Sequence, residues 1–414
     1  MTTPSWKPQA RPTARRWRPG LLLAALTVLL VACTSPSPSP SGQRSTVSSQ
    51  QRPAAPRQRD YWPTNGWRSA PPKAEGMDPA VLAAIAGNVA SLYPQVRSVL
   101  VVRHGYLVYE RYWQGMTASD GNDVQSVTKS VVSALVGIAL GDGKLKSLNQ
   151  PVGELLARHL PPDADPRLAQ VTLEQLLTMT SGLAGDDPSL GGDPRVSQRQ
   201  GASRDWVHHI LGRRLATDPG SSFAYSSATS QLLSAIVADA TGHSTLAFAR
   251  ARLFRPLGIA SAKAPQPVFV AHPSPAALKA YERAPVAWPT DPQGYQLGFG
   301  GLKLPSRDLA KLGYLYLNGG RWDTTQVIPA GYVAASTRPH STPPPDGPGE
   351  SYGYQWWETS QAGHPSYLAH GRDGHLIQVV PDLDLVVVIT SNATQNRNPA
   401  RLLVGQAIIP AVTD

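Results

Sequence analysis

The feature that most constrains this chain is a serine and a lysine three residues apart, followed by a long apolar run. In a helix, Ser126 and Lys129 would lie on one face, about one turn apart. Residues 131–140 are almost all apolar, so the helix lacks a polar face and should be buried, with Lys129 buried at its mouth. Asn122 and Asp123 are favoured N-cap residues, which would place Ser126 in or near the first turn, at the positive end of the helix dipole.

Burial would give Lys129 a chemistry that an exposed lysine lacks. It disfavours the charged ammonium and lowers the pKa, so that a neutral amine can accept a proton from a neighbouring hydroxyl. Ser-x-x-Lys arises by chance about once in a chain of this size. Of the nine lysines here, however, only Lys129 follows a serine by three positions. We therefore expect Ser126 to be an activated nucleophile.

Residues 1–33 have the pattern of a bacterial export signal. A basic stretch without acidic residues precedes an apolar run over 21–32, which is shorter than the roughly 20 residues of a membrane span. The run ends in Leu30-Val31-Ala32-Cys33, which resembles the lipobox of bacterial lipoproteins. Cys33 is the only cysteine, which excludes an internal disulfide. We expect export and a lipid anchor on Cys33 that holds the chain to a bacterial membrane; the alternative is an ordinary signal peptide with an incidental cysteine.

Residues 34–60 are rich in Ser, Pro and Gln and are predicted to form a flexible tether. The formal net charge of the chain is +10, and residues 1–60 contribute +8 of it, with nine basic side chains and one acidic one. Residues 61–414 are therefore close to neutral. The basic balance belongs to the leader and tether, and it gives no support for a nucleic-acid partner.

Residues 61–414 are predicted to form an α+β domain. Helical patterns cover about 78–92, 171–179, 228–239 and 399–409, whereas β-branched and aromatic runs predict strands over 98–103, 106–113, 352–357, 366–369, 376–380 and 383–390. Strands at both ends with helices between them indicate one antiparallel sheet from 61–125 and 345–414, flanked by helices and interrupted by a large helical insertion at 126–344. The helix after Ser126 would leave the sheet for this insertion, so its start is expected at their junction.

Two further segments could complete a site around Ser126. Tyr225 lies in a loop rich in glycine and serine before a helix, where a phenol could shuttle a proton beside a lysine, although a packed loop aromatic is the alternative. His370-Gly371-Arg372 precedes a strong strand, and a glycine at a strand edge lets a ligand approach the backbone. The N–H groups of Ser126 and Arg372 are therefore candidate oxyanion donors.

These motifs stand in an order that resembles the serine β-lactamases and penicillin-binding proteins. The resemblance is greatest to the branch that holds class C β-lactamases, serine esterases of that fold and 6-aminohexanoate-dimer hydrolase. It covers roughly residues 66–409 and rests on Ser126-x-x-Lys129, Tyr225-x-Ser227, Ala369-His370-Gly371, Leu176-Leu177-Thr178-Met179-Thr180-Ser181-Gly182-Leu183, Phe254-Arg255-Pro256-Leu257-Gly258-Ile259, Arg307-Asp308-Leu309-Ala310-Lys311-Leu312-Gly313 and Tyr352-Gly353-Tyr354-Gln355-Trp356-Trp357.

The resemblance implies a β-lactamase/transpeptidase-like fold in which Ser126 is acylated and Lys129 and Tyr225 share the acid and base roles. Ser227, His370, Gly371 and Arg372 would bind substrate or form the oxyanion hole. Two positions depart from the family pattern. Ser227 stands where the family has an asparagine. Ala369-His370-Gly371 stands where the family has Lys-Thr-Gly, so the lysine of that motif is replaced by Ala369, and the chain has no lysine after Lys311. The missing lysine argues against a dedicated β-lactamase or D-Ala-D-Ala carboxypeptidase.

We predict a serine hydrolase that cleaves a small ester or amide through an acyl-enzyme, without cofactor or metal. His208 and His209 are adjacent and would point to different sides of a helix, and the chain contains neither His-Glu-x-x-His nor a serine in Gly-x-Ser-x-Gly. Two alternatives stay open. One is a β-lactamase or D-Ala-D-Ala carboxypeptidase, and the other is a catalytically impaired, penicillin-binding-like protein of the cell wall.

Overall fold

The computed structural model describes residues 59–259, 274–392 and 399–414. The predicted export signal, the lipobox Cys33 and nearly all of the predicted tether lie outside the described residues.

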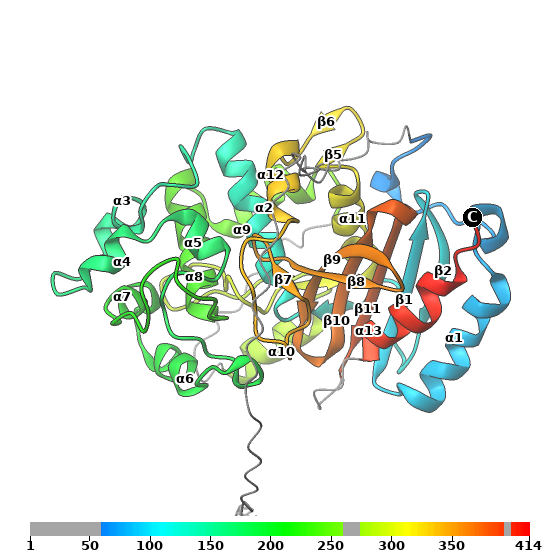
Figure 1. The fold of residues 1–414 in the computed structure, drawn as a ribbon, viewed down its shortest axis with the longest axis horizontal. Coiled ribbons are helices and arrows are strands. Elements are labelled where there is room, and N and C mark those ends of the chain that lie inside the picture. Colours follow the sequence, from blue (N-terminus) through cyan, green and yellow to red (C-terminus); the bar gives the residue numbers. More distant parts are fainter. Residues whose placement is uncertain (1–58, 260–273, 393–398) are drawn as a thin grey trace, which may run out of the picture. The chain divides into compact units, whose positions relative to one another are not determined.

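A seven-stranded antiparallel sheet forms one part of the fold (Figure 1). Its strand order is β2-β1-β11-β10-β9-β8-β7. The strands are β1 (Val96–Arg103), β2 (Tyr106–Tyr112), β7 (Ser351–Tyr352), β8 (Trp357–Gln361), β9 (His364–Gly371), β10 (His375–Val380) and β11 (Leu385–Ser391). Two small antiparallel pairs lie outside it: β3 (Gly121–Asp123) with β4 (Lys303–Pro305), and β5 (Arg321–Trp322) with β6 (Thr325–Gln326). The antiparallel sheet assembled from both ends of the domain confirms the predicted α+β class.

Helices occupy the long segment between β3 and β7. They are α2 (Val127–Gly141), α3 (Val152–Leu155), α4 (Pro166–Gln170), α5 (Leu173–Leu177), α6 (Arg195–Ala202), α7 (Trp206–Leu211), α8 (Ser227–Thr241), α9 (Thr245–Ala249), α10 (Pro275–Arg283), α11 (Ser306–Leu317) and α12 (Ala330–Ser336). Helix α1 (Pro79–Leu92) precedes the sheet, and α13 (Pro399–Leu403) continues through a π turn and a 3-10 turn to Ala411. Asp78 caps α1 by accepting hydrogen bonds from the N–H groups of Ala80 and Val81.

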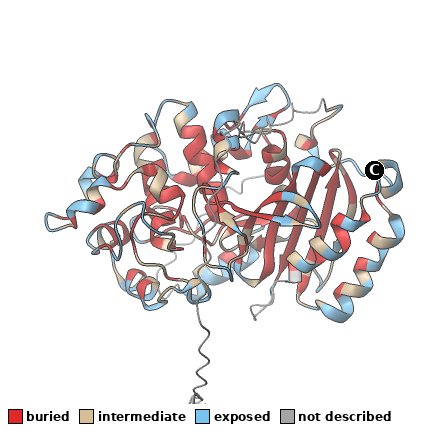
Figure 2. Ribbon diagram, viewed as in Figure 1, coloured by how far each residue is buried: buried red, intermediate tan, exposed pale blue. Residues whose placement is uncertain are grey.

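Both faces of the central strands are covered, which explains why β1 and β11 are buried along nearly their whole length (Figure 2). Val99 and Val101 of β1 pack with apolar side chains of α1 and the C-terminal helical segment. Leu100 and Val102 point to the opposite face and join the larger cluster that contains α2 and α11. The sheet therefore separates two apolar layers, and the helical region is attached to one of them.

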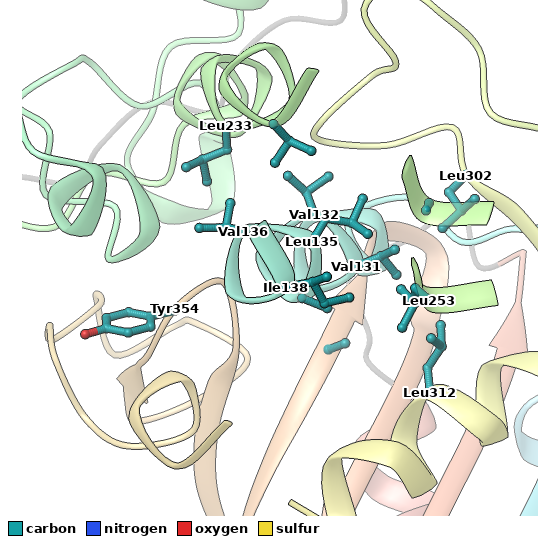
Figure 3. Close-up of a cluster of buried hydrophobic side chains, with 14 of the residues drawn as sticks. Val131, Val132, Leu135, Val136, Ile138, Leu233, Leu253, Leu302, Leu312 and Tyr354 are labelled. Atoms are coloured by element: carbon teal, nitrogen blue, oxygen red, sulfur yellow. The ribbon is translucent and has the colours of Figure 1, made fainter. Parts of the chain in front are cut away.

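Helix α2 is buried on all sides from Val127 to Ala139, as its apolar sequence predicts. Figure 3 shows its side chains directed toward Leu233 of α8 on one side and toward Leu312 of α11 on the other. Each fully buried Val, Leu or Ile contributes about 1.5–3 kcal/mol relative to exposure. A helix fixed in this way from every side gives the residues at its N-terminus a rigid base.

The prediction of one continuous strand over residues 352–357 is wrong, because residues 353–356 are not part of a strand. Strand β7 ends at Tyr352 and β8 begins at Trp357, with a tight turn between them. Gln355 has φ +62°, and its side-chain amide donates to the carbonyl of Leu177 at 2.9 Å. At Gly353, a Cβ atom would overlap the carbonyl oxygen of Ser336. Hydrophobic patterning does not register such a turn because its apolar residues, Tyr354 and Trp356, are buried like those of a strand.

Glu358 on β8 is a buried carboxyl with incomplete hydrogen bonding. Its Oε2 accepts from the Ser351 hydroxyl at 2.7 Å, whereas Oε1 has no hydrogen-bond partner among the described residues. Burial raises the pKa of Glu358 to about 7, and the hydrogen bond from Ser351 opposes this rise.

Replacing Glu358 with glutamine should therefore stabilise the protein at pH 8 by about 1–3 kcal/mol and change little near pH 5. Because the folded-state pKa lies above the ordinary value of 4.5, the wild type loses stability as pH rises from about 4.5 to about 7, and glutamine removes that loss. Urea unfolding at both pH values measures the difference. Asp346→Asn, which alters an exposed carboxylate, serves as control. Equal effects of Glu358→Gln at both pH values would contradict the assignment.

Within the described residues, no single helix has both the length and the hydropathy of a membrane span. Helix α8 and the helical segment Thr245–Phe254 meet these criteria only as a pair, bent by 73° at the break between them.

Candidate active site

Ser126 lies at the start of α2, as the N-cap residue. Gln125 before it has φ +49°, which turns the chain sharply from β3 into the helix. The predicted capping by Asn122 or Asp123 is wrong, because both residues belong to β3. The Asp123 carboxylate instead accepts a hydrogen bond from the N–H of Gln125 at 3.1 Å and so holds the turn. Ser126 is half-buried.

Lys129 lies one turn into α2 and is only 2% exposed, as predicted. Its Nζ donates to Ser126 Oγ at 3.0 Å and to the backbone oxygen of Phe299 at 3.0 Å. Burial lowers the pKa of Lys129 to about 8. The carboxylates of Asp186 and Asp187 oppose this shift, and the Arg372 guanidinium adds to it. A substantial share of the Lys129 side chains is therefore neutral at slightly alkaline pH.

Tyr225 reaches this pair from the loop before α8. The Lys129 Nζ lies 4.8 Å from the centre of the Tyr225 ring. The ring stacks on Trp357 at 5.6 Å and meets Tyr352 edge-on at 6.4 Å. Burial raises the pKa of Tyr225, and a hydrogen bond with the Ser126 side chain opposes this rise. The phenol thus stays protonated near neutral pH, beside the serine hydroxyl. Tyr225 is both a packed aromatic and a neighbour of the Ser126 hydroxyl.

Asp186 holds the Tyr225 loop against α8. Its N–H donates to the carbonyl of Tyr225 at 3.1 Å, and its Oδ1 accepts from the N–H of Ser227 at 3.0 Å. Ser227 is thereby fixed at the first position of α8. The Asp186 carboxylate is buried and raises the pKa of Lys129. Sequence patterns gave no indication of Asp186, since an isolated aspartate in a loop has many structural uses.

The end of β9 brings the third predicted motif to the same place. A Cβ atom at Gly371 would overlap the carbonyl oxygen of Val124 and would lie 3.3 Å from Cβ of Gln125. Only glycine therefore allows β9 to approach the segment that leads into Ser126. His370 is half-buried on β9, whereas Arg372 is exposed just beyond the strand. The Arg372 charge acts on both Lys129 and Tyr225.

Phe299 is the second contribution that the sequence did not indicate. Its carbonyl accepts from Lys129, and its ring stacks on Trp206 with centroids 6.2 Å apart. Phe299 precedes Gly300 and Gly301, a pair of glycines that marks an irregular loop. That signal predicts a loop, but it does not predict where in the fold the carbonyl points.

The arrangement provides a hydroxyl, a buried amine with a lowered pKa and a protonated phenol within one small volume. Such a set can activate a nucleophile and return a proton to a leaving group. In the part of the chain that the structure describes, no group of three or more His, Cys, Asp or Glu side chains could hold a metal ion.

The chain is similar in sequence to known proteins. The beta-lactamase family profile matches residues 95–407. Esterase EstB from Burkholderia gladioli is 33% identical over 215 residues, which cover 46% of this chain and 54% of that protein. This chain therefore matches about half of the esterase's length.

Two solved structures show the same fold. A protein from Bacillus anthracis, assigned as a 6-aminohexanoate-dimer hydrolase, has a TM-score of 0.64 at 19% identity, over 83% of this chain and 87% of that chain. The octameric penicillin-binding protein homologue from Pyrococcus abyssi has a TM-score of 0.60 at 18% identity, over 80% of this chain and 77% of that chain. The predicted β-lactamase/transpeptidase-like architecture is confirmed.

Proposed function

This chain belongs to the beta-lactamase family, and from that premise we propose that it is a serine hydrolase that cleaves an ester or amide bond through an acyl-enzyme on Ser126. The observation that carries the proposal is the 3.0 Å hydrogen bond from the buried Lys129 Nζ to Ser126 Oγ. An amine with a pKa of about 8 at this distance is suited to remove the serine proton near neutral pH.

In the first half of the reaction, the neutral Lys129 amine takes the Ser126 proton as Oγ bonds to the substrate carbonyl carbon. Tyr225, whose raised pKa keeps it protonated, gives its proton to the leaving group as the ester or amide bond breaks. The proton on Lys129 then returns to the phenolate. The backbone N–H groups of Ser126 and Arg372 stabilise the transient oxyanion.

In the second half, water attacks the acyl carbon and gives a proton to the same lysine and tyrosine pair. The acid is released, and Ser126 regains its proton.

Two residues favour an ester over a β-lactam or a D-Ala-D-Ala peptide. Ala369 stands where those enzymes use a lysine to place the substrate carboxylate, and Ala369 is buried and neutral. Ser227 stands in place of an asparagine and presents a shorter side chain. The similarity to an esterase over about half its length supports the same direction.

A substrate panel tests this proposal. The kcat/KM for p-nitrophenyl acetate and butyrate should exceed that for nitrocefin and a D-Ala-D-Ala peptide by at least about 100-fold. The matching p-nitroanilides show whether amides are cleaved as well. Faster turnover of nitrocefin or the peptide would overturn the ester preference. No turnover of any substrate by folded protein would support a catalytically impaired binding protein instead.

We also propose that the chain is exported and anchored by a lipid on Cys33, on the basis of the sequence alone. In cells, the wild type should fractionate with membranes, and Cys33→Ser should move to the soluble extracytoplasmic fraction. A wild-type protein found in the soluble extracytoplasmic fraction, with Cys33 either unmodified or removed by cleavage, would contradict the lipid anchor.

A further inference from the structure

The carbonyl that accepts from Lys129 belongs to a tightly held segment, residues 289–299, which we call the Phe299 loop. Within the described residues, Ser126 Oγ and the Phe299 oxygen are the two hydrogen-bond acceptors of the Lys129 Nζ. Ser126 Oγ changes its bonding during acylation, whereas the Phe299 carbonyl is present throughout. The position of that carbonyl therefore bears directly on the catalytic amine.

One glutamine of α8 ties both ends of this loop together. Gln231 is fully buried. Its Oε1 accepts from the N–H of Gly298 at 2.9 Å, immediately before Phe299. Its Nε2 donates to Oδ2 of Asp291 at 2.9 Å, near the start of the loop. The side-chain amide of Gln231 thus uses its oxygen to bind the backbone near Phe299 and its NH2 group to bind Asp291.

Asp291 in turn organises the turn that begins the loop. It is fully buried, and its Oδ1 accepts from the N–H groups of Gln293 at 2.9 Å and Tyr295 at 3.0 Å. Burial raises the pKa of Asp291 to about 6, and these hydrogen bonds together with the one from Gln231 oppose the rise. The Asp205 carboxylate also raises it. At pH 7–8 Asp291 is therefore largely ionised and acts as an acceptor.

The loop also lies flush against α8. A Cβ atom at Gly298 would overlap the carbonyl oxygen of Ser230, so only glycine fits there. The hydroxyl of Ser234, one turn further along α8, donates to the carbonyl of Gln296 at 2.8 Å. The position of Gly298, directly before Phe299, is therefore fixed by the hydrogen bond to Gln231 and by close packing against Ser230.

We propose that Gln231 and Asp291 are positioning residues for catalysis, which hold the segment Gly298–Phe299 so that the Phe299 carbonyl stays on Nζ of Lys129. This inference rests on the proposed acyl-enzyme function. Neither side chain belongs to the reacting set, since both act through a hydrogen-bond chain that ends on the lysine.

The hydrogen-bond pattern allows a test by exchange of the two groups. Asp291→Asn places an NH2 group opposite the Gln231 NH2, and a flip of Gln231 would then turn its NH2 toward the N–H of Gly298. Gln231→Glu places two carboxylates face to face. The double variant, Gln231→Glu with Asp291→Asn, restores the pattern with its polarity reversed. The new amide at position 291 donates to the new carboxylate at position 231, whose other oxygen still accepts from Gly298.

The rate of covalent labelling by a fluorophosphonate is the readout, with thermal unfolding recorded for every variant. Each single variant should label about 10–100-fold more slowly than the wild type, as small misplacements in an active site commonly cause. The double variant should return to within about threefold. The kcat for p-nitrophenyl acetate should follow the labelling rate, with little change in KM.

The pH profile separates positioning from a general loss of structure. Lys129 is faced by Asp186, Asp187, Arg372 and Tyr225, none of which is altered. Loss of the Phe299 acceptor favours the neutral amine, so the acidic limb of labelling should move to lower pH in Asp291→Asn and return in the double variant. Asp239→Asn is the matched control, because Asp239 binds the Tyr295 hydroxyl of the same loop at 2.9 Å but lies outside the Gln231 chain.

The possible results separate the two proposals. A folded wild type that does not label at all would refute the proposed function. A wild type that labels, with single variants that label equally fast, would refute the positioning role alone. The positioning role would also be overturned if the single variants labelled slowly and the double variant did not recover the wild-type labelling rate. It would be overturned as well if the acidic limb of the pH profile did not move in Asp291→Asn.

Discussion

Replacing Ser126 with alanine should lower kcat/KM for p-nitrophenyl acetate by about 1,000-fold or more. The hydroxyl is the group that bonds to the acyl carbon in our account, and alanine has no atom that can form this bond. Hydrolysis rates of the purified full chain measure the effect, and thermal unfolding shows whether the variant is folded. The Ser126 hydroxyl accepts from the buried Lys129 amine and hydrogen-bonds with Tyr225, so the variant should lose about 1–2 kcal/mol of stability and still unfold cooperatively.

Ser133→Ala provides the matched control. Ser133 lies on the same helix and pairs with the Tyr332 hydroxyl at 2.9 Å, away from the reacting groups. It should lose about 1 kcal/mol of stability and retain its rate. If Ser126→Ala kept most of the activity, another nucleophile would have to be sought.

Replacing Lys129 with methionine should lower kcat by about 100- to 10,000-fold while it stabilises the fold. The rate falls because the base is lost. The stability rises by about 1–3 kcal/mol at pH 7, because burial lowers the pKa of Lys129 to about 8 and the folded wild type holds an unfavourable ammonium below that pH. The gain should shrink as pH rises through about 8, where the folded-state lysine loses its proton.

The pH dependence of the rate follows from the same pKa. Wild-type activity should increase as pH rises through about 8, since the neutral amine is the active form, and this limb should disappear in Lys129→Met. Lys144→Met changes an exposed lysine just after the same helix and should alter neither quantity. A Lys129→Met variant with loss of both activity and stability would indicate that the lysine has a structural role.

The sequence predicted those parts of the site that depend on spacing along one helix. Ser126 and Lys129 are one turn apart in any helix, and the apolar residues after them require burial, so their hydrogen bond and the lowered pKa could be expected. Tyr225 and Gly371 were indicated by their loop and strand-edge settings, and by the order of family motifs. The sheet was predictable because β1, β10 and β11 carry strong β-branched runs.

The contributions that escaped prediction act through the backbone or across long sequence separations. The Phe299 carbonyl meets Lys129 across 170 positions, and no residue type marks a backbone oxygen as an acceptor. Gln231 and Asp291 are ordinary polar residues whose roles appear only when α8 and the Phe299 loop are packed together. The N-cap prediction for Asn122 and Asp123 failed because β4, far along the chain, pairs with that segment and draws it into a strand.

Intact-mass spectrometry of the full chain after exposure to a fluorophosphonate, beside Ser126→Ala, tests the central claim most directly. We predict a single adduct on the wild type that maps to Ser126 by peptide analysis, and no adduct on the variant. An unmodified wild type that unfolds cooperatively, or an adduct that persists in Ser126→Ala, would contradict an activated nucleophile at the start of α2.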